Sequence, residues 1–281
     1  MTATPNPFEQ TAVSGGPWTS SEQRSEVVAA ANVGKIHVIP VPDGPARAAF
    51  SEVLYRGFEV AVALVGLIVA LPLILLGFAL VWFDSPGPVL FPARRAARSA
   101  QVRGGDLVGR TDLIPPPGGY DAQALYCVPV YFTLYKLRTM YVDARKRFPE
   151  LYAYKYSVES FQSGCFKVKD DPRVTRAGKW LRRASIDELP NLWSVVIGDM
   201  RLVGPRPEIA EVIQYYTPEQ MLKFTVKPGI TGLAQIGGRG LLTWGETLAL
   251  DVQYVKTRTI ALDLKIIFLT IVRVLTSHGA F

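Results

Sequence analysis

The strongest pattern along the chain is an uncharged apolar run from Val60 to Phe83. As an α-helix this run would be about 36 Å long at 1.5 Å per residue, which exceeds the roughly 30 Å thickness of the hydrocarbon core of a bilayer. Length alone therefore predicts one transmembrane helix. The run begins too late to be a secretory signal peptide, and no small-residue cleavage site accompanies it.

Pro72 lies near the middle of this run and opens a second interpretation. Proline removes a helical hydrogen bond and clashes with the carbonyl group four residues earlier, so the helix could bend there and return to the face that it entered. Arg47 and Arg56 precede the run, which is compatible with both ends facing the cytoplasm. The downstream side is marked as cytoplasmic by four arginines: Arg94, Arg95, Arg98 and Arg103.

Shorter elements are predicted on both sides of the apolar run. The first fifty residues are rich in Ser, Thr, Ala, Pro and Gly and are expected to be a mostly mobile tail, with one possible strand at 35–40. The Gly- and Pro-rich stretch 101–129 is expected to be a long surface loop. A strand is predicted at 128–136, and helices at 141–160, 174–184, 189–197 and 260–276. The last helix is apolar almost all round, so it is either a core helix or a helix in the membrane interface.

Composition and charge narrow the classes of function. The chain has 281 residues, of which 49% are hydrophobic, and a net charge of +7; its mean hydropathy is +0.18. These values suggest membrane contact and anionic partners. Cys127 and Cys165 form neither a metal-type spacing nor a disulfide framework, which favours a reducing compartment. His37 and His278 lie far apart in the sequence, so a histidine-based metal site or triad is not expected.

Two adjacent carboxylates, Asp187 and Glu188, are the densest candidate for chemistry. A purely structural interpretation is a capping box, with Ser185 as N-cap and Glu188 three residues later. That register puts Pro190 at the fifth helical position, where it costs a hydrogen bond, whereas a helix that begins at Asp187 holds Pro190 in its first turn. In both cases the carboxylates lie at a helix start, near backbone N–H groups and the positive end of the helix dipole.

Basic residues on both sides of the pair favour a catalytic role. Lys179, Arg182 and Arg183 precede it, and the segments Gly-Pro-Arg-Pro at 204–207 and Gly-Gly-Arg-Gly at 237–240 follow it. Arginines bind diphosphate oxygens in bidentate fashion, and a carboxylate can attack phosphorus or hold a divalent cation that bridges phosphates. The pattern suits phosphoryl transfer. Each Gly-Arg element alone could also be a turn with a solvated arginine, and similar basic clusters serve nucleic-acid binding.

Seven segments in one order carry a resemblance to a known family. They are Tyr-Lys-Leu-Arg-Thr-Met at 135–140, Asp-Pro-Arg-Val-Thr at 171–175, residues 181–191, Gly-Asp-Met-Arg-Leu-Val-Gly-Pro-Arg-Pro at 198–207, Lys-Pro-Gly-Ile-Thr-Gly-Leu-Ala-Gln at 227–235, Leu-Asp-Val-Gln-Tyr-Val at 250–255 and Leu-Asp-Leu-Lys at 262–265. Together they resemble the bacterial sugar transferases, the monotopic polyprenyl-phosphate phosphoglycosyl transferases. The resemblance covers residues 51–276 in outline.

The resemblance implies an α+β, predominantly helical fold: a monotopic membrane protein with a re-entrant helix–break–helix and amphipathic interfacial helices. The chain would divide into a mostly mobile tail at 1–50, the re-entrant membrane helix at 51–83 and a catalytic domain at 84–281, on the cytoplasmic face of the bacterial inner membrane. Three departures from the family pattern stand out. Leu71 replaces a serine that often precedes the break proline, Glu59 replaces a common aspartate, and the loop 94–130 is longer than the usual connector.

The resemblance also implies a ping-pong transfer of a phosphosugar from a UDP-sugar to polyprenyl (undecaprenyl) phosphate, the first membrane step of glycoconjugate or exopolysaccharide synthesis. Asp187 would attack the sugar-linked phosphate, UMP would leave, and the polyprenyl phosphate would then accept the phosphosugar. Glu188, together with Asp187, would hold Mg²⁺. Further residues match family positions expected near the phosphates: Lys136, Arg138, Arg182, Arg206, Arg239, Asp263 and, as a weaker candidate, Asp251.

Three classes of function compete at this point. The first is the transferase, whose partners would be UDP-sugar, polyprenyl phosphate and membrane lipid, with a homodimer left open. The second is a catalytically silent, membrane-anchored adaptor of the same fold, against which the intact Asp187–Glu188 pair argues. The third is a basic nucleic-acid-binding protein; the membrane segment argues against it, and no nucleic-acid partner is expected. No residue distinguishes a hexose donor from an N-acetylhexosamine donor.

Overall fold

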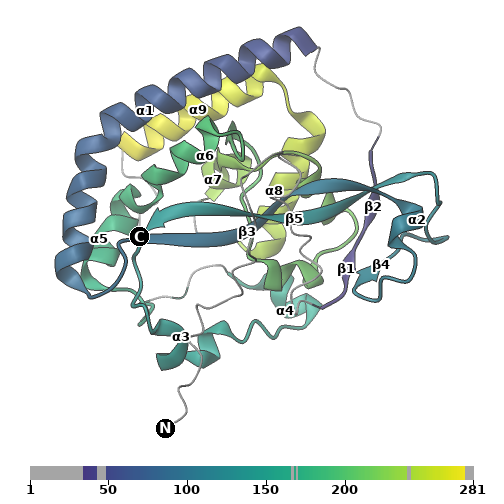
Figure 1. Ribbon diagram of the computed structural model, residues 1–281, viewed down its shortest axis with the longest axis horizontal. Helices are drawn as coiled ribbons and strands as arrows, with labels where there is room; N and C mark the ends of the chain where they lie inside the picture. Colours follow the sequence, from purple (N-terminus) through teal and green to yellow (C-terminus); the bar gives the residue numbers. More distant parts are fainter. Residues whose placement is uncertain (1–33, 43–48, 166–167, 169, 239–241, 276–281) are drawn as a thin grey trace, which may run out of the picture.

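The computed structural model describes residues 34–42, 49–165, 168, 170–238 and 242–275. Most of the tail expected at 1–50, namely residues 1–33 and 43–48, lies outside the described residues, and so does the candidate residue Arg239. The described chain combines helices with small, mostly antiparallel and partly parallel sheets in an α+β arrangement, as expected (Figure 1). The longest element is α1 (Ala49–Asp84), which runs along one edge of the molecule and contains Pro72.

Two long antiparallel strands form the centre of the main sheet. β3 (Leu90–Arg103) pairs with β5 (Leu125–Leu137), and a bulge lies between Ala96 and Arg98. Three shorter pairings complete the strands: β2 (Ile39–Pro40) on the other edge of β5, β1 (Ile36–His37) parallel to β4 (Leu113–Ile114), and β6 (Arg201–Val203) parallel to β7 (Gly229–Thr231). The strand predicted at 128–136 is therefore confirmed as part of β5, and the possible strand at 35–40 is present as two short strands.

The long surface loop expected at 101–129 is not observed, and that prediction was wrong. This stretch contains the end of β3, the short helix α2 (Gly104–Leu107), the strand β4 and the start of β5. Alanines and arginines dominate β3 and lack the β-branched character that predicts a strand. Pairing with β5, whose residues are aromatic and β-branched, holds β3 extended. This pairing is a tertiary effect that no local pattern displays.

The helices differ from prediction mainly in their boundaries. α5 (Arg176–Ala184) confirms the helix predicted at 174–184. The helix predicted at 189–197 is a 3₁₀ helix, Ile186–Asn191, followed by α6 (Leu192–Val196). The stretch 141–160 divides into α3 (Ala144–Arg147), a 3₁₀ turn at Pro149–Tyr152 and α4 (Val158–Ser163). The remaining elements are 3₁₀ helices at Ala210–Tyr215 and Gln220–Thr225, and the helices α7 (Leu233–Gly238), α8 (Trp244–Thr257) and α9 (Ile260–Leu275).

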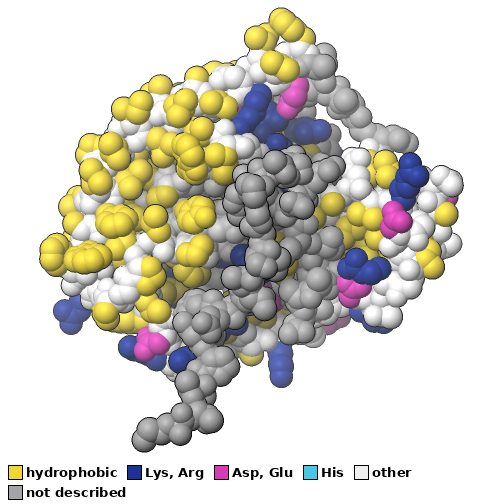
Figure 2. All heavy atoms as spheres, viewed as in Figure 1, with side chains coloured by type: hydrophobic (Ala, Val, Ile, Leu, Met, Phe, Trp, Pro, Cys, Tyr) yellow, Lys and Arg dark blue, Asp and Glu magenta, His cyan; other side chains and the backbone are white. Residues whose placement is uncertain are grey.

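One side of α1 packs on the rest of the protein while its other side is exposed and apolar. Within the described chain α1 is the one helix long and apolar enough to cross a membrane, over Phe50–Asp84. The helix changes direction along its length (Figure 1), but it is continuous through Pro72, so the break in the helix that was expected there is not observed. Apolar side chains gather on the surface over this helix (Figure 2).

α9 lies beside the first part of α1 (Figure 1), and Ile266 of α9 shares a buried cluster with Ala63 of α1. The other side of α9 exposes Leu264 and Phe268. Because one face is buried and the other is exposed and apolar, α9 matches the interfacial interpretation better than that of a wholly buried core helix.

Three buried clusters hold the elements together. The largest joins the inner faces of β3 and β5 to α4, α8 and the 3₁₀ helices. A second lies between α1, α6, β6 and α9. The smallest consists of Val81, Val89, Leu137, Leu181 and Ile186, with Leu189 packed against it. This last cluster ties the second half of α1 to the segment that carries the two adjacent carboxylates.

Candidate active site

The two carboxylates follow a sharp turn between α5 and the 3₁₀ helix. Ser185 adopts the left-handed conformation, with φ 57° and ψ 21°, and makes no side-chain capping hydrogen bond. The capping box is therefore not formed, and both carboxylates occupy the first turn of the 3₁₀ helix. Ile186 is buried in the cluster below α1, which anchors the turn. Asp187 is 8% exposed.

Cations from two distant segments meet the Glu188 carboxylate. Lys136, near the end of β5, places its Nζ 2.6 Å from Glu188 Oε1. Arg206, in the segment after β6, places its Nη2 3.6 Å from the same oxygen. The negative charge of Glu188 is the main reason that the pKa of Arg206 is raised. The Glu188 side chain keeps an exposed fraction of 25%, so the cluster opens to solvent.

Asp187 lies deeper than Glu188 and its charge is less well compensated. Burial, followed by the charge of Glu188, raises the pKa of Asp187, while Lys136 and Arg182 act in the opposite direction. Arg182 is fixed by its Nε, which donates to Thr139 Oγ1 at 2.8 Å. Burial lowers the pKa of Arg182, and the charge of Asp187 partly offsets this. The arrangement is a desolvated carboxylate held between cations, which is the electrostatic setting of a nucleophile.

The backbone of the segment that carries Arg206 is pinned by close packing of two glycines. A Cβ atom on Gly204 would lie 2.6 Å from the carbonyl oxygen of Lys227, and a Cβ on Gly229 would lie 2.0 Å from the nitrogen of Gly204. The Gly229 N–H donates to Pro205 O at 3.0 Å, and the Gly204 N–H donates to Thr231 O at 2.9 Å. Both positions therefore require glycine, and the pairing of this segment with β7 fixes the origin of the Arg206 side chain.

Asp251 lies in a buried group of charged side chains next to this segment. Lys223 Nζ lies 2.9 Å from Asp251 Oδ2 and 2.9 Å from Glu208 Oε1, and all three side chains are buried. Burial lowers the pKa of Lys223, but the two carboxylates outweigh it, so the net direction is upward. After the larger effect of Glu188, the charges of Glu208 and Asp251 also raise the pKa of Arg206. Asp251, predicted as a weak phosphate-binding candidate, thus belongs to a buried ion triad behind Arg206.

Two other predicted residues lie away from the carboxylate pair. Arg138 donates to the carbonyl oxygens of Ser85 at 2.6 Å and Pro86 at 2.5 Å, so its guanidinium fastens the chain that follows α1. Asp263, on α9, accepts a 2.8 Å hydrogen bond from Tyr254 Oη and lines a separate cavity. Of the predicted site residues, the structure gathers Lys136, Arg182, Asp187, Glu188 and Arg206.

Arg95 lies near the site, although the sequence did not predict it as a site residue. It lies on β3, and its pKa is lowered by burial and by the like charge of Arg206. The residue was visible only as one of several arginines marking a cytoplasmic side. Its place beside Arg206 follows from the β3 pairing and from the bridge between Ala96 and Glu208, neither of which has a local sequence signal.

The two carboxylates offer Mg²⁺ only part of a coordination sphere. No group of three or more His, Cys, Asp or Glu side chains that could hold a metal occurs within the described ranges. Mg²⁺ usually retains waters and is held by one or two carboxylates plus substrate phosphates. Two adjacent carboxylates, one of them partly exposed, fit that mode, whereas a cage built of protein ligands alone is not available from the described residues.

Comparison with known proteins finds similar sequences among bacterial sugar transferases. Residues 128–277 match the family model described as "Bacterial sugar transferase". The chain is 43% identical over 150 residues to the galactosyl transferase CpsE of Streptococcus agalactiae, covering 53% of this chain and 32% of that protein. It is 43% identical over 148 residues to the uncharacterized sugar transferase EpsL of Bacillus subtilis, covering 53% of this chain and 65% of EpsL.

A longer match is to the UDP-glucose:undecaprenyl-phosphate glucose-1-phosphate transferase of Caulobacter vibrioides. The identity is 35% over 250 residues, which covers 85% of this chain and 76% of that protein. By contrast, the matched region spans about a third of CpsE. The similarity therefore extends over more of the chain than the segment 128–277 that the family model matches.

Proposed function

The chain belongs to the bacterial sugar transferase family, and on that premise we propose that it transfers a phosphosugar from a UDP-sugar to polyprenyl phosphate and releases UMP. The observation that carries this proposal is the convergence of Lys136, Arg182 and Arg206 on Asp187 and Glu188. The name of the Caulobacter relative states the same class of reaction. The reaction begins glycoconjugate or exopolysaccharide assembly.

Asp187 is the nucleophile of the first step. One of its carboxylate oxygens attacks the phosphorus that bears the sugar, a P–O bond forms, and the P–O bond to the UMP phosphate breaks with its electron pair leaving on UMP. The phosphosugar remains on Asp187 as an acyl phosphate. Burial supports this role because a poorly solvated carboxylate is a stronger nucleophile once it is ionised. Lys136 and Arg182 favour the ionised form.

The second step regenerates the carboxylate. An oxygen of the polyprenyl phosphate attacks the same phosphorus, and the bond between phosphorus and the Asp187 oxygen breaks. The product is a polyprenyl diphosphosugar. Both substrates are anionic and would be repelled by two bare carboxylates, so the cations around the pair offset that repulsion and stabilise the charge that develops on the phosphoryl oxygens.

Asp187 and Glu188 would hold Mg²⁺ together with substrate phosphates. The ion would neutralise phosphate charge and orient the diphosphate when bound. Glu188 is suited to this role because it is the more exposed of the two carboxylates and lies between Lys136 and Arg206. These cations hold its carboxylate in place before substrate arrives.

Contacts along both halves of α1 support a re-entrant anchor on the cytoplasmic face of the inner membrane. In the first half, Glu59 accepts from the Leu202 N–H at 3.0 Å. At the far end, Asp84 Oδ2 accepts from the Ala177 N–H at 3.1 Å. A helix that spanned the bilayer would carry one end about 30 Å or more away from the domain at the other end. Here both ends are attached to the same domain.

Exposed aromatic side chains beside α1 indicate the membrane-facing surface. Trp180 of α5 and Trp193 of α6 have exposed fractions of 45% and 51%, and both helices pack against α1. Trp82 and Phe268 are also exposed. Tryptophan favours the headgroup level of a bilayer. A surface built from α1, α5, α6 and α9 would therefore seat the protein in one leaflet, with the carboxylate pair near the lipid phosphates.

The transfer is tested by measuring UMP release from a panel of UDP-sugars with Mg²⁺ and undecaprenyl phosphate. Wild-type protein is expected to release UMP with at least one donor, whereas Asp187→Asn releases none above background. Radiolabel from the sugar should be trapped on wild-type protein when the lipid acceptor is omitted. Absence of UMP with every donor would favour the membrane-anchored adaptor of the same fold.

Topology is tested by cysteine labelling in intact and permeabilised cells. The exposed Cys165 reports on the catalytic domain, and a cysteine introduced at Ser20, in a Cys165→Ser background, reports on the segment before α1. Both sites should react with an impermeant reagent only after the inner membrane is opened. Labelling of the Ser20 position from the periplasm would establish a full span instead.

A further inference from the structure

A cavity separate from the carboxylate pair lies beside the first turns of α1. Its volume is about 490 Å³, within the roughly 300–1,000 Å³ range of small-molecule sites. Side chains from α1, β6, the segment before β7, α8 and its C-terminal end, and α9 form its walls. The charged ones are four cations and two carboxylates: Arg56, Arg201, Lys227, Arg258, Glu52 and Asp263. Neither Asp187 nor Glu188 lines it. Arg56 is about 30 Å along the helix axis from Gly77, which packs on Ile186 beside the carboxylate pair.

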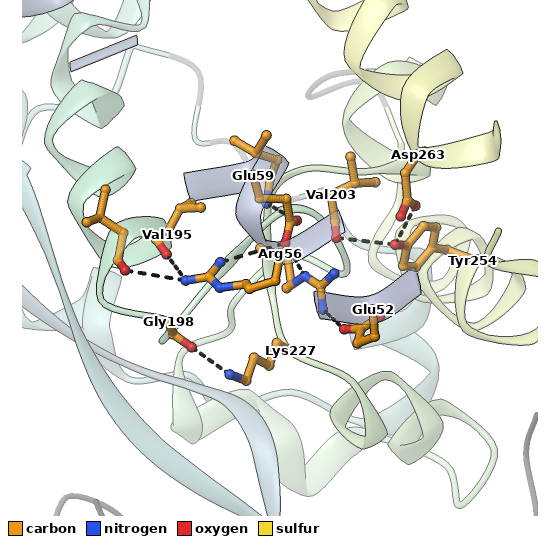
Figure 3. Close-up of polar contacts among 12 residues, drawn as sticks. Glu52, Arg56, Glu59, Val195, Gly198, Val203, Lys227, Tyr254 and Asp263 are labelled. Atoms are coloured by element: carbon orange, nitrogen blue, oxygen red, sulfur yellow. Dashed lines mark hydrogen bonds and ion pairs between the residues drawn. The ribbon is translucent and has the colours of Figure 1, made fainter. Parts of the chain in front are cut away.

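Arg56 and Lys227 are held by hydrogen bonds to carbonyl oxygens (Figure 3). The four cations outnumber the carboxylates of Glu52, Glu59 and Asp263 beside them, so their charge is only partly balanced. Arg201 forms ion pairs with Glu52 and Glu59. Arg56 donates to the carbonyl oxygens of Val195 and Val196 and lies 3.7 Å from Glu59 Oε2. Carbonyl groups orient the Arg56 guanidinium without neutralising it. The nearby Glu59 carboxylate is shared between Arg56 and Arg201.

Lys227 carries the clearest sign of excess positive potential. Its Nζ donates to the Gly198 carbonyl oxygen at 2.8 Å rather than to a carboxylate. Burial lowers the pKa of Lys227, and the like charges of Arg98, Arg56 and Arg201 lower it further. Arg258, at the end of α8, is exposed beside the same cavity. A bound anion would relieve this repulsion among cations.

The rim of the cavity is apolar on the side of α1. Val53, which lines the cavity, is 70% exposed, and Phe50 and Leu54 on the same turns are 77% and 60% exposed. A free anion would gain nothing from this rim. An amphiphile would place its charge among the cations and its chains along α1, which is the apolar helix assigned to the membrane.

We propose that this cavity binds the headgroup phosphate of an anionic phospholipid, with Lys227 and Arg258 as its principal contacts and Arg56 and Arg201 behind them. The acyl chains lie along the exposed side of the first turns of α1. This inference rests on the proposed membrane association but not on the transfer chemistry. A bound lipid would fix the depth of α1 and of the catalytic domain in the leaflet.

The test is the melting temperature of the full chain in uncharged detergent micelles, with phosphatidylglycerol, phosphatidylcholine or inorganic phosphate added. Phosphatidylglycerol should raise the melting temperature of wild-type protein by several degrees, and the other two additives should not. The double variant Lys227→Gln, Arg258→Gln should lose most of this shift. A matched control, Lys155→Gln with Lys256→Gln, removes the same charge from exposed positions outside the cavity lining and should keep it.

Three outcomes would overturn the assignment. They are a full shift in the cavity variant, an equal loss in the control, or an equal shift with phosphatidylcholine or inorganic phosphate. If the double variant fails to fold, Arg258→Gln alone replaces it because Arg258 is exposed; it should lose part of the shift, and an unchanged shift counts against the site. UMP release without added phospholipid should be equal in the cavity variant and the control, which separates this test from that of the transfer.

Discussion

Lys136 Nζ lies 2.6 Å from Glu188 Oε1 although the two residues are 52 positions apart in the chain. The contact joins the end of β5 to the first turn of the 3₁₀ helix, with exposed fractions of 19% and 25% for the two side chains. The same lysine acts on Asp187 and lowers its pKa against the effect of burial. One cation therefore contacts Glu188 and favours the ionised form of Asp187, and this has measurable consequences.

The rate of the first half-reaction should rise with pH as Asp187 ionises. Because burial and Glu188 raise the pKa of this carboxyl, the midpoint should lie above the ordinary value of about 3.9. The measurement is single-turnover UMP release across a pH series without lipid acceptor. A rate that stays flat down to the ordinary aspartate range would contradict the raised pKa.

Lys136→Met should move that midpoint to higher pH, because the charge that favours ionised Asp187 is removed. It should also lower kcat/KM by about 10²–10³-fold, the usual cost of losing one preorganised charge at a phosphoryl or oxyanion site. Lys146→Met removes an equal charge from the exposed surface of α3 and serves as control. An equal loss in both variants would assign the effect to net charge rather than to the Glu188 contact.

Asp187→Asn should abolish transfer yet stabilise the fold at neutral pH. The folded-state pKa of Asp187 is raised, so the folded protein binds a proton more readily than the unfolded chain. The stability linked to that proton is complete below the unfolded pKa and is lost as pH rises through the folded one. At neutral pH the ionised aspartate therefore destabilises the fold, and a neutral asparagine does not.

The check is thermal unfolding of wild-type and Asp187→Asn protein at several pH values. The melting temperature of the variant should be higher by a few degrees at neutral pH, since about 1 kcal/mol corresponds to roughly 2–4 °C in a domain of this size. The difference should shrink as the pH falls below the folded pKa. A difference that grows on acidification would show that the sign is wrong.

Lys223→Met should destabilise the protein strongly, because it leaves Glu208 and Asp251 buried without their shared cation. Removing one partner of a buried ion group typically costs about 3–5 kcal/mol. The triple change Lys223→Met, Glu208→Gln, Asp251→Asn should recover part of that loss. Glu208 and Asp251 also act on the charge of Arg206, so any folded variant should show a raised KM for UDP-sugar. Equal stability of the single and triple variants would contradict the charge argument.

The sequence predicted the elements whose signal is local. The apolar run, the β-branched strand β5, the basic helix α5 and the carboxylate pair all have such signals, and each is present in the structure. The basic segment 204–207 had already pointed to Arg206, whereas the resemblance selected Lys136, and the structure brings both to Glu188.

The features that the sequence did not predict are created by tertiary contacts. β3 has an Ala- and Arg-rich sequence and is extended because β5 pairs with it. Arg138 was chosen with Lys136 from the same motif, but the two side chains have different partners: Arg138 donates to Ser85 and Pro86, while Lys136 reaches Glu188. Arg239 lies outside the described residues, so its predicted role stays a prediction.

Gly77→Ala should loosen the contact between α1 and the catalytic segment. A Cβ at this position would lie 2.6 Å from Leu137 Cδ1 and 3.2 Å from both Leu181 Cδ2 and Ile186 Cγ2. These three side chains belong to the buried cluster below α1, so they have little room to retreat. Overpacking of this kind costs about 1–3 kcal/mol, which exceeds the gain of up to about 1 kcal/mol from alanine in a helix.

Gly57→Ala on the same helix provides the matched control for this change. No described atom lies within 4 Å of a Cβ at Gly57, so this variant should be neutral or more stable by up to about 1 kcal/mol. Gly77→Ala should lower both the melting temperature and the rate of UMP release, because displacing Ile186 moves the adjacent Asp187. If both variants melt and turn over alike, the close packing at Gly77 does not position the carboxylates. If Gly77→Ala melts earlier but keeps its full rate, the contact stabilises the fold without setting the geometry of the site.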